Sequence, residues 1–81
     1  MKILKFAAEW CGPCKMLSKT LEDYEGVPIE EIDIDQKREV AEKYGIRGVP
    51  TLILLDDNGV ELRRRSGMMM FSEFEKFVKG E

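Results

Sequence analysis

The sequence predicts an α/β fold, in which a four-stranded mixed sheet carries helices on both of its faces. Apolar runs of strand length alternate with segments of helical periodicity, in the order strand–helix–strand–helix–strand–strand–helix. A right-handed crossover makes the first two strands parallel, and the turn signal Asp57-Asn58-Gly59 makes the last two an antiparallel hairpin. The 81 residues are enough for a single domain, residues 1–81, with a modest core.

The first strand and the first helix flank the two cysteines of the chain. Residues 3–8 are mostly apolar, which is the pattern of a strand covered on both faces. A helix is expected over residues 12–25, because apolar side chains recur on one face and charged side chains on the other. Pro13 suits the first turn of this helix, where no backbone N–H is needed, and Gly26 is expected to end it.

A second strand and a second helix follow directly. Residues 28–35 contain alternating isoleucine and acidic side chains, which indicates a half-buried strand. Asp35 is the expected N-cap of a helix over residues 36–44, and Gly45 is expected to close that helix.

The last three elements are a hairpin and a helix. Residues 52–55 form a short apolar strand, and residues 60–65 return antiparallel to it after the turn. The run Ser72-Glu73-Phe74-Glu75 has the pattern of a capping box and predicts the start of the last helix, with Gly80 after its end. The buried face of that helix is expected to carry Phe74, Phe77 and Val78.

Composition and charge argue against several classes of protein. Hydrophobic residues make up 43% of the chain and charged residues 36%, as in ordinary globular domains. The net charge of -3 gives no electrostatic reason to expect nucleic acid as a ligand. No apolar run approaches the roughly 20 residues that span a bilayer, and the first apolar run is too short for a secretory signal. We therefore expect a cytoplasmic protein without a membrane or nucleic-acid partner.

The only two cysteines lie in the pentapeptide Trp10-Cys11-Gly12-Pro13-Cys14, at the expected start of a helix. Cysteines at this spacing can close a small disulfide and reopen it by exchange, and the helix N-terminus favours a thiolate on the first sulfur. Metal binding is the competing interpretation. The chain has no histidine, so a closed four-ligand zinc site cannot form within one chain, whereas a zinc ion or iron–sulfur cluster shared by two chains remains open. We expect a reactive dithiol and no metal.

Two segments resemble the thioredoxin family. The run from Ala8 to Met16 is similar to the active-site segment of that family, and the run from Tyr44 to Leu52 is similar to its second signature. The similarity covers almost the whole chain, but the strand and helix that open full-length thioredoxins have no counterpart. The resemblance thus implies a minimal thioredoxin fold, β-α-β-α-β-β-α, closer in size to a glutaredoxin.

The resemblance also implies the roles of individual residues. Cys11 would attack a substrate disulfide, and Cys14 would resolve the mixed disulfide that forms. Pro50 matches the cis proline of the family, which leaves the backbone groups of Val49 free to pair with an extended substrate. The expected substrate-binding residues are Trp10, Gly12, Pro13, Val49, Pro50, Gly67 and Met68.

Three positions depart from the family pattern. Lys5 stands where thioredoxins usually carry a buried aspartate, and Glu31 stands where they carry its lysine partner. Since a buried lysine without a partner would be costly, we expect Lys5 and Glu31 to meet on neighbouring strands, partly buried, and either loss to be strongly destabilising. Glu31 is then expected to take the proton of Cys14. Ala7 replaces a large aromatic residue, which leaves the floor of the active site less filled.

Taken over the whole chain, the resemblance implies a protein-disulfide reductase that uses the Cys11/Cys14 couple and no further cofactor. Thioredoxin reductase or another donor would supply electrons to this monomer, and protein disulfides would accept them, ribonucleotide reductase being a typical client. One alternative is a glutaredoxin-type enzyme that uses glutathione, although glutaredoxins typically carry Pro-Tyr between the cysteines. The other is a binding subunit, such as a polymerase processivity partner, whose redox activity is incidental.

Overall fold

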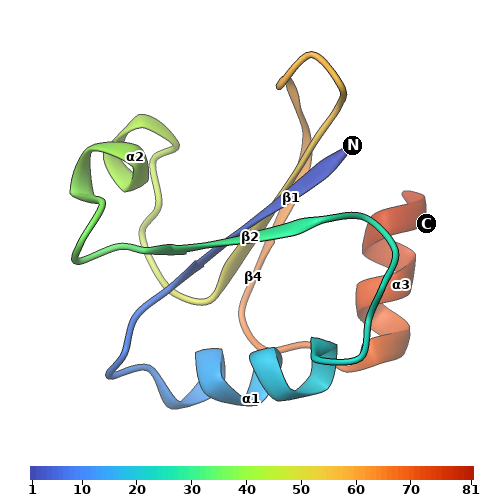
Figure 1. Ribbon diagram of the computed structural model, residues 1–81, viewed down its shortest axis with the longest axis horizontal. Coiled ribbons are helices and arrows are strands. Elements are labelled where there is room, and N and C mark those ends of the chain that lie inside the picture. Colours follow the sequence, from blue (N-terminus) through green and yellow to red (C-terminus); the bar gives the residue numbers. More distant parts are fainter.

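The computed structural model describes residues 1–81, and its elements follow in the predicted order (Figure 1). They are β1 (Lys2–Ala7), α1 (Gly12–Leu21), β2 (Ile29–Asp33), α2 (Arg38–Lys43), β3 (Thr51–Leu55), β4 (Glu61–Ser66) and α3 (Phe71–Lys79). The strand order in the sheet is β2-β1-β3-β4, in which β1 is parallel to β2 and antiparallel to β3, and β3 is antiparallel to β4. The predicted four-stranded mixed sheet is confirmed. None of the helices has the length and apolar character that a membrane-spanning helix requires.

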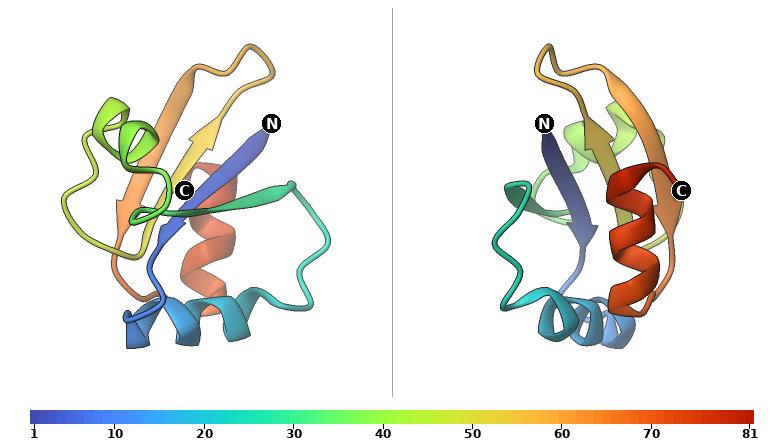
Figure 2. Two further views of the ribbon diagram at one scale, coloured as in Figure 1. Left: turned by 60° about the vertical axis from the view of Figure 1, so that its left-hand side comes forward. Right: turned by 90° about the vertical axis from the view of Figure 1, so that its right-hand side faces the viewer.

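The central strand β1 sends side chains into two separate cores. Ile3 packs with residues of α1 and α3 on one face of the sheet, whereas Leu4 and Phe6 pack against α2 on the other. Figure 2 shows α2 and α3 on opposite sides of the sheet. Because successive side chains of a strand point to opposite faces, Lys5 and Ala7 lie on the same face as Ile3, under α1.

Helix α1 is shorter than the sequence predicts and ends at Leu21. Beyond it, the backbone N–H of Tyr24 donates to the carbonyl of Leu21 at 3.0 Å, and the Tyr24 hydroxyl accepts a bond from the N–H of Val27 at 2.8 Å. These bonds turn the chain toward β2 before Gly26 is reached, so the expected end at Gly26 is wrong.

The start of α2 also differs from the expectation, because Asp33 rather than Asp35 accepts the local backbone bonds. Its Oδ1 accepts hydrogen bonds from the N–H groups of Asp35 and Gln36 at 2.8 and 3.2 Å. This turn ends β2 at Asp33 and delays the helix to Arg38, whose N-cap is Lys37 with no side-chain bond. The predicted N-cap role of Asp35 is therefore wrong.

Helix α3 begins at Phe71, one residue before the predicted box. The carboxylate of Glu73 accepts a hydrogen bond from the N–H of Met70 at 3.0 Å. It also forms an ion pair with Arg65, at 2.6 Å. The backbone bond first, and Arg65 second, lower the pKa of Glu73 below its ordinary value. The predicted burial of Phe74 and Phe77 is confirmed, and Gly80 ends the helix with φ 80°.

Candidate active site

Cys11 is the N-cap residue of α1, and Cys14 lies in the first turn of that helix. The two sulfurs form a disulfide, with their Cα atoms 5.3 Å apart. The backbone N–H of Cys14 donates to Cys11 Sγ at 3.1 Å. An N–H that already points at this sulfur, together with the positive end of the helix, stabilises negative charge on Cys11 once the disulfide is reduced.

The structure buries both cysteines. Cys11 is 4% exposed and Cys14 2%, and they pack with Ala7 and Ala8 at the end of β1. The position of Cys11 ahead of the helix suggests a sulfur near solvent, and this disulfide form shows that such an interpretation is wrong. What distinguishes Cys11 from Cys14 is the hydrogen bond from the helix N-terminus, rather than a difference in exposure.

The loop before β3 forms the wall opposite the helix. The carbonyl oxygen of Val49 lies 3.7 Å from Cys11 Sγ, and the Val49–Pro50 peptide bond is cis, as predicted. The carbonyl of Pro50 accepts a hydrogen bond from the N–H of Gly67 at 2.8 Å. Three segments that are distant in the sequence thus meet beside Cys11.

Gly67 faces open space. Its φ of 92° lies in the left-handed region that favours glycine, and a Cβ at this position would meet no atom within 4 Å. The next residue, Met68, is 40% exposed. Of the expected substrate-binding residues, Gly12 and Pro13 are also exposed, between the two cysteines.

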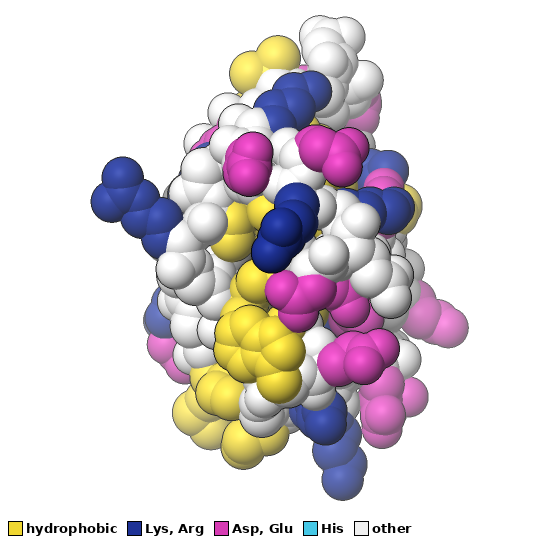
Figure 3. Space-filling model, turned by 90° about the vertical axis from the view of Figure 1, so that its left-hand side faces the viewer, with side chains coloured by type: hydrophobic (Ala, Val, Ile, Leu, Met, Phe, Trp, Pro, Cys, Tyr) yellow, Lys and Arg dark blue, Asp and Glu magenta, His cyan; other side chains and the backbone are white.

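Trp10 is 69% exposed, beside the disulfide. Its indole N–H donates to Asp35 Oδ2 at 2.9 Å, which ties the active-site loop to the turn after β2. Asp35 was expected to cap a helix, and no local pattern in the sequence marks its contact with Trp10. On the face drawn in Figure 3, hydrophobic side chains gather over the lower part of the molecule, where β1 leads into α1.

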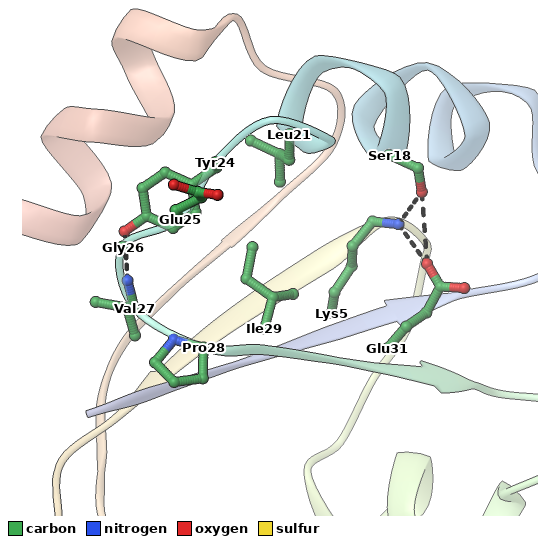
Figure 4. Close-up of a pocket in the computed structure, with 10 residues that line it drawn as sticks. All are labelled: Lys5, Ser18, Leu21, Tyr24, Glu25, Gly26, Val27, Pro28, Ile29 and Glu31. Carbon is green, nitrogen blue, oxygen red and sulfur yellow. Dashed lines mark hydrogen bonds and ion pairs between the residues drawn. The ribbon is translucent and has the colours of Figure 1, made fainter.

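The predicted contact between Lys5 and Glu31 is present. These residues are register partners on β1 and β2, and Lys5 Nζ donates to Glu31 Oε1 at 2.6 Å. Ser18 of α1, which the sequence analysis missed, also bonds Lys5 Nζ, and its Oγ lies 3.4 Å from Glu31 Oε1 (Figure 4). Its one sequence signal is the spacing of four residues from Cys14, which puts both on one side of the helix.

The exposure of the two charges differs from the expectation. The Lys5 side chain is 4% exposed, whereas the Glu31 side chain is 61% exposed, because β2 is an edge strand. The expectation that both partners are partly buried is therefore wrong: one charge is fully enclosed and the other largely solvated.

Because only Lys5 is enclosed, replacing Lys5 and replacing Glu31 should change the free energy of unfolding by different amounts. Lys5→Met should leave the free energy of unfolding within about 1 kcal/mol of wild type or raise it, because Glu31 can be hydrated. Glu31→Met should lower it by about 1–3 kcal/mol, because the buried ammonium keeps only Ser18. Urea denaturation measures both, with Lys2→Met as control, since Lys2 forms an exposed pair with Glu30 on the same strands. A larger loss for Lys5→Met would contradict this account.

Comparisons with known proteins agree with this geometry. The family model described as Thioredoxin matches residues 1–80. The thioredoxin of Pseudomonas aeruginosa is 42% identical over 81 aligned positions, gaps included, and the alignment covers 94% of this chain and 74% of the relative. The SPbeta prophage-derived thioredoxin-like protein YosR of Bacillus subtilis is 42% identical over 79 residues, 98% of this chain and 96% of the relative.

Solved structures give the same result. A mutant thioredoxin from Halobacterium salinarum NRC-1 matches with a TM-score of 0.88 and 32% identity, over 98% of this chain and 72% of that chain. Proteins of this family act on protein disulfides and are reduced by a reductase partner. The chain therefore belongs to the thioredoxin family and, with its Cys11–Cys14 disulfide, is a thiol-disulfide oxidoreductase that reduces protein disulfides.

Proposed function

We propose that this protein carries electrons from a thioredoxin reductase to disulfides of cytoplasmic proteins, with ribonucleotide reductase as a representative client. Cys11 is the attacking residue and Cys14 the resolving residue, and no cofactor beyond their disulfide takes part. The observation that carries this proposal is the hydrogen bond from the N–H of Cys14 to Cys11 Sγ at the N-cap of α1. This bond favours the thiolate on Cys11, and the thiolate is the nucleophile in disulfide exchange.

The proposed reaction consists of two exchange steps. The Cys11 thiolate attacks one sulfur of the client disulfide, so that a mixed disulfide forms and the other client sulfur leaves as a thiolate. Cys14 then loses its proton and attacks Cys11 Sγ. The Cys11–Cys14 bond forms, the bond to the client breaks, and the second client sulfur leaves with the electron pair. The client gains two electrons, which the reductase later restores to the protein.

The client segment would lie in extended form across Val49 and Pro50. Proline has no backbone N–H, and the carbonyl of Val49 is beside Cys11 Sγ, so a paired segment would bring its disulfide to that sulfur. The open space at Gly67 and the exposed thioether of Met68 provide a second, adaptable apolar wall.

The segment after β4 favours a thioredoxin reductase over glutathione as the donor. Glutathione carries two carboxylates and needs cationic or polar groups to hold them. The segment that borders the groove here is Gly67-Met68-Met69-Met70, in which Met69 is buried and the other two methionines are exposed. An apolar wall of this kind suits a protein surface better than a charged tripeptide.

The donor is tested by insulin disulfide reduction in two parallel assays, one with thioredoxin reductase and NADPH, the other with glutathione, glutathione reductase and NADPH. We expect turnover in the first assay and background rates in the second. The double variant Cys11→Ser/Cys14→Ser controls for reduction that does not use the dithiol. Faster turnover with glutathione would instead identify a glutaredoxin-type enzyme.

The order of attack is tested by brief alkylation of the reduced protein between pH 6 and 7, followed by peptide mapping. We expect the label mainly on Cys11, because the helix N-terminus stabilises its thiolate. In addition, Cys14→Ser should accumulate a mixed disulfide with a client, whereas Cys11→Ser should accumulate none. A label mainly on Cys14 would reverse the two assignments.

The groove is tested at Gly67. Gly67→Glu should reduce turnover of a protein disulfide at least about tenfold, equivalent to about 1.4 kcal/mol, because it places charge and bulk where the client would lie. Reduction of a small disulfide should change little. Gly67→Ala is the matched control, since it introduces the same backbone strain at positive φ without the charge or length. Equal losses on the large and small substrates would show that the groove lies elsewhere.

A further inference from the structure

Lys5 is the one charged residue among the buried residues of this protein. A hydrophobic residue of similar size at such a site is often equally or more stabilising, so stability alone does not explain a buried ammonium. Its two partners, Ser18 and Glu31, come from different elements, α1 and β2, and Figure 4 shows both oxygens converging on Lys5 Nζ.

Ser18 and Glu31 line two hollows. The larger, of about 450 Å³, is the open pocket of Figure 4 between the end of α1 and β2, and Lys5 is one of its lining residues. The smaller, of about 200 Å³, is lined by Cys14, Ser18 and Glu31 together with the small side chains Ala7 and Ala8. About 15 Å³ of such volume is enough for one water molecule, so the smaller hollow can hold a short chain of waters beside Cys14.

Cys14 needs a route by which its proton can leave. The residue is 2% exposed, and it must become a thiolate to resolve the mixed disulfide. Three carboxylates line the hollow that reaches it, those of Glu9, Glu31 and Asp33. Asp33 Oδ1 is already bonded to two backbone N–H groups, whereas Lys5 and Ser18 fix the carboxylate of Glu31 and no side-chain hydrogen bond fixes that of Glu9.

We propose that Glu31 is the proton acceptor for Cys14, through water in the smaller hollow, and that Lys5 and Ser18 are the positioning residues that hold its carboxylate there. This inference rests on the proposed roles of Cys11 and Cys14. The negative charge of Glu31 is kept in place by the enclosed ammonium of Lys5, while its exposed side exchanges protons with solvent.

The resolving step transfers one proton to Glu31 and one electron pair to the client sulfur. The proton of Cys14 Sγ passes through water to the carboxylate of Glu31 as Cys14 Sγ attacks Cys11 Sγ. The Cys11–Cys14 bond forms, and the client sulfur leaves with the electron pair of the broken bond. Glu31 then returns its proton to the client thiolate or to solvent, so the protein ends as a disulfide and the client as a thiol.

The test is rapid mixing of the reduced protein with dithiobis(nitrobenzoate), which releases one coloured thiolate on attack by Cys11 and a second on resolution by Cys14. In Glu31→Gln, which keeps the side-chain shape, we expect an unchanged first phase and a second phase slowed at least about tenfold near neutral pH. The slowing should disappear at high pH, where hydroxide removes the proton. Ser18→Ala should slow the second phase less.

Two variants serve as matched controls. Glu30→Gln removes the neighbouring carboxylate of the same strand, which is paired with Lys2 and does not line the smaller hollow, so neither phase should change. Asp33→Asn removes another carboxylate that lines the hollow and should leave the second phase nearly as fast as wild type. An unchanged second phase and pH profile in Glu31→Gln would overturn the proposal, as would slowing by Asp33→Asn alone. A missing first phase in the wild-type protein would instead contradict the proposed role of Cys11.

Discussion

The pairing of β1 with a strand on each side is the constraint on which the rest of this structure depends. β1 is parallel to β2 and antiparallel to β3, and its residues from Ile3 to Ala7 are buried. A strand in this position cannot shift by one residue without exchanging the side chains of the two cores. The short loop that follows it therefore places Cys11 at a fixed point relative to the sheet, which no property of the dithiol motif could do alone.

The active site is assembled from backbone groups more than from side chains. The N–H of Cys14, the carbonyl of Val49 and the bond between Pro50 and Gly67 come from three segments, each anchored by a different strand or helix. Almost any residue could supply such backbone groups. The surroundings of Cys11 Sγ are therefore determined by where the three segments lie, more than by which side chains they carry. The side chains that do matter are those of the two cysteines and, in the proposed proton route, that of Glu31.

The order of the elements and the position of the dithiol could be predicted from the sequence, because strand length, helical periodicity, turn signals and the cysteine spacing are local patterns. The end of α1 could not, since the hydroxyl of Tyr24 turns the chain away while the apolar periodicity continues. The role of Asp35 was missed for the same kind of reason: two aspartates two residues apart carry the same local signal, and a contact with Trp10 distinguishes them.

The network around Lys5 was predicted only in part. Its pairing with Glu31 followed from alignment with the family pattern, but the exposure of Glu31 depends on β2 being an edge strand, which local sequence does not reveal. Ser18 could not be placed either, because its contact depends on how α1 crosses the sheet. The sequence thus predicted that Lys5 and Glu31 form an ion pair, whereas their different exposure to solvent follows from the tertiary structure.

The register of β1 with β3 has a consequence for synthesis of the protein. Lys2 is opposite Leu55 and Phe6 is opposite Thr51, so the first strand finds its second neighbour only after residues 51–55 have also left the ribosome. Contacts between such distant segments form late, because the loop between them must first be closed. The two thiols, by contrast, are close in the sequence from the moment they are made. During translation they are therefore exposed to oxidants before the fold can shield them, and the nascent chain relies on its surroundings to keep them reduced.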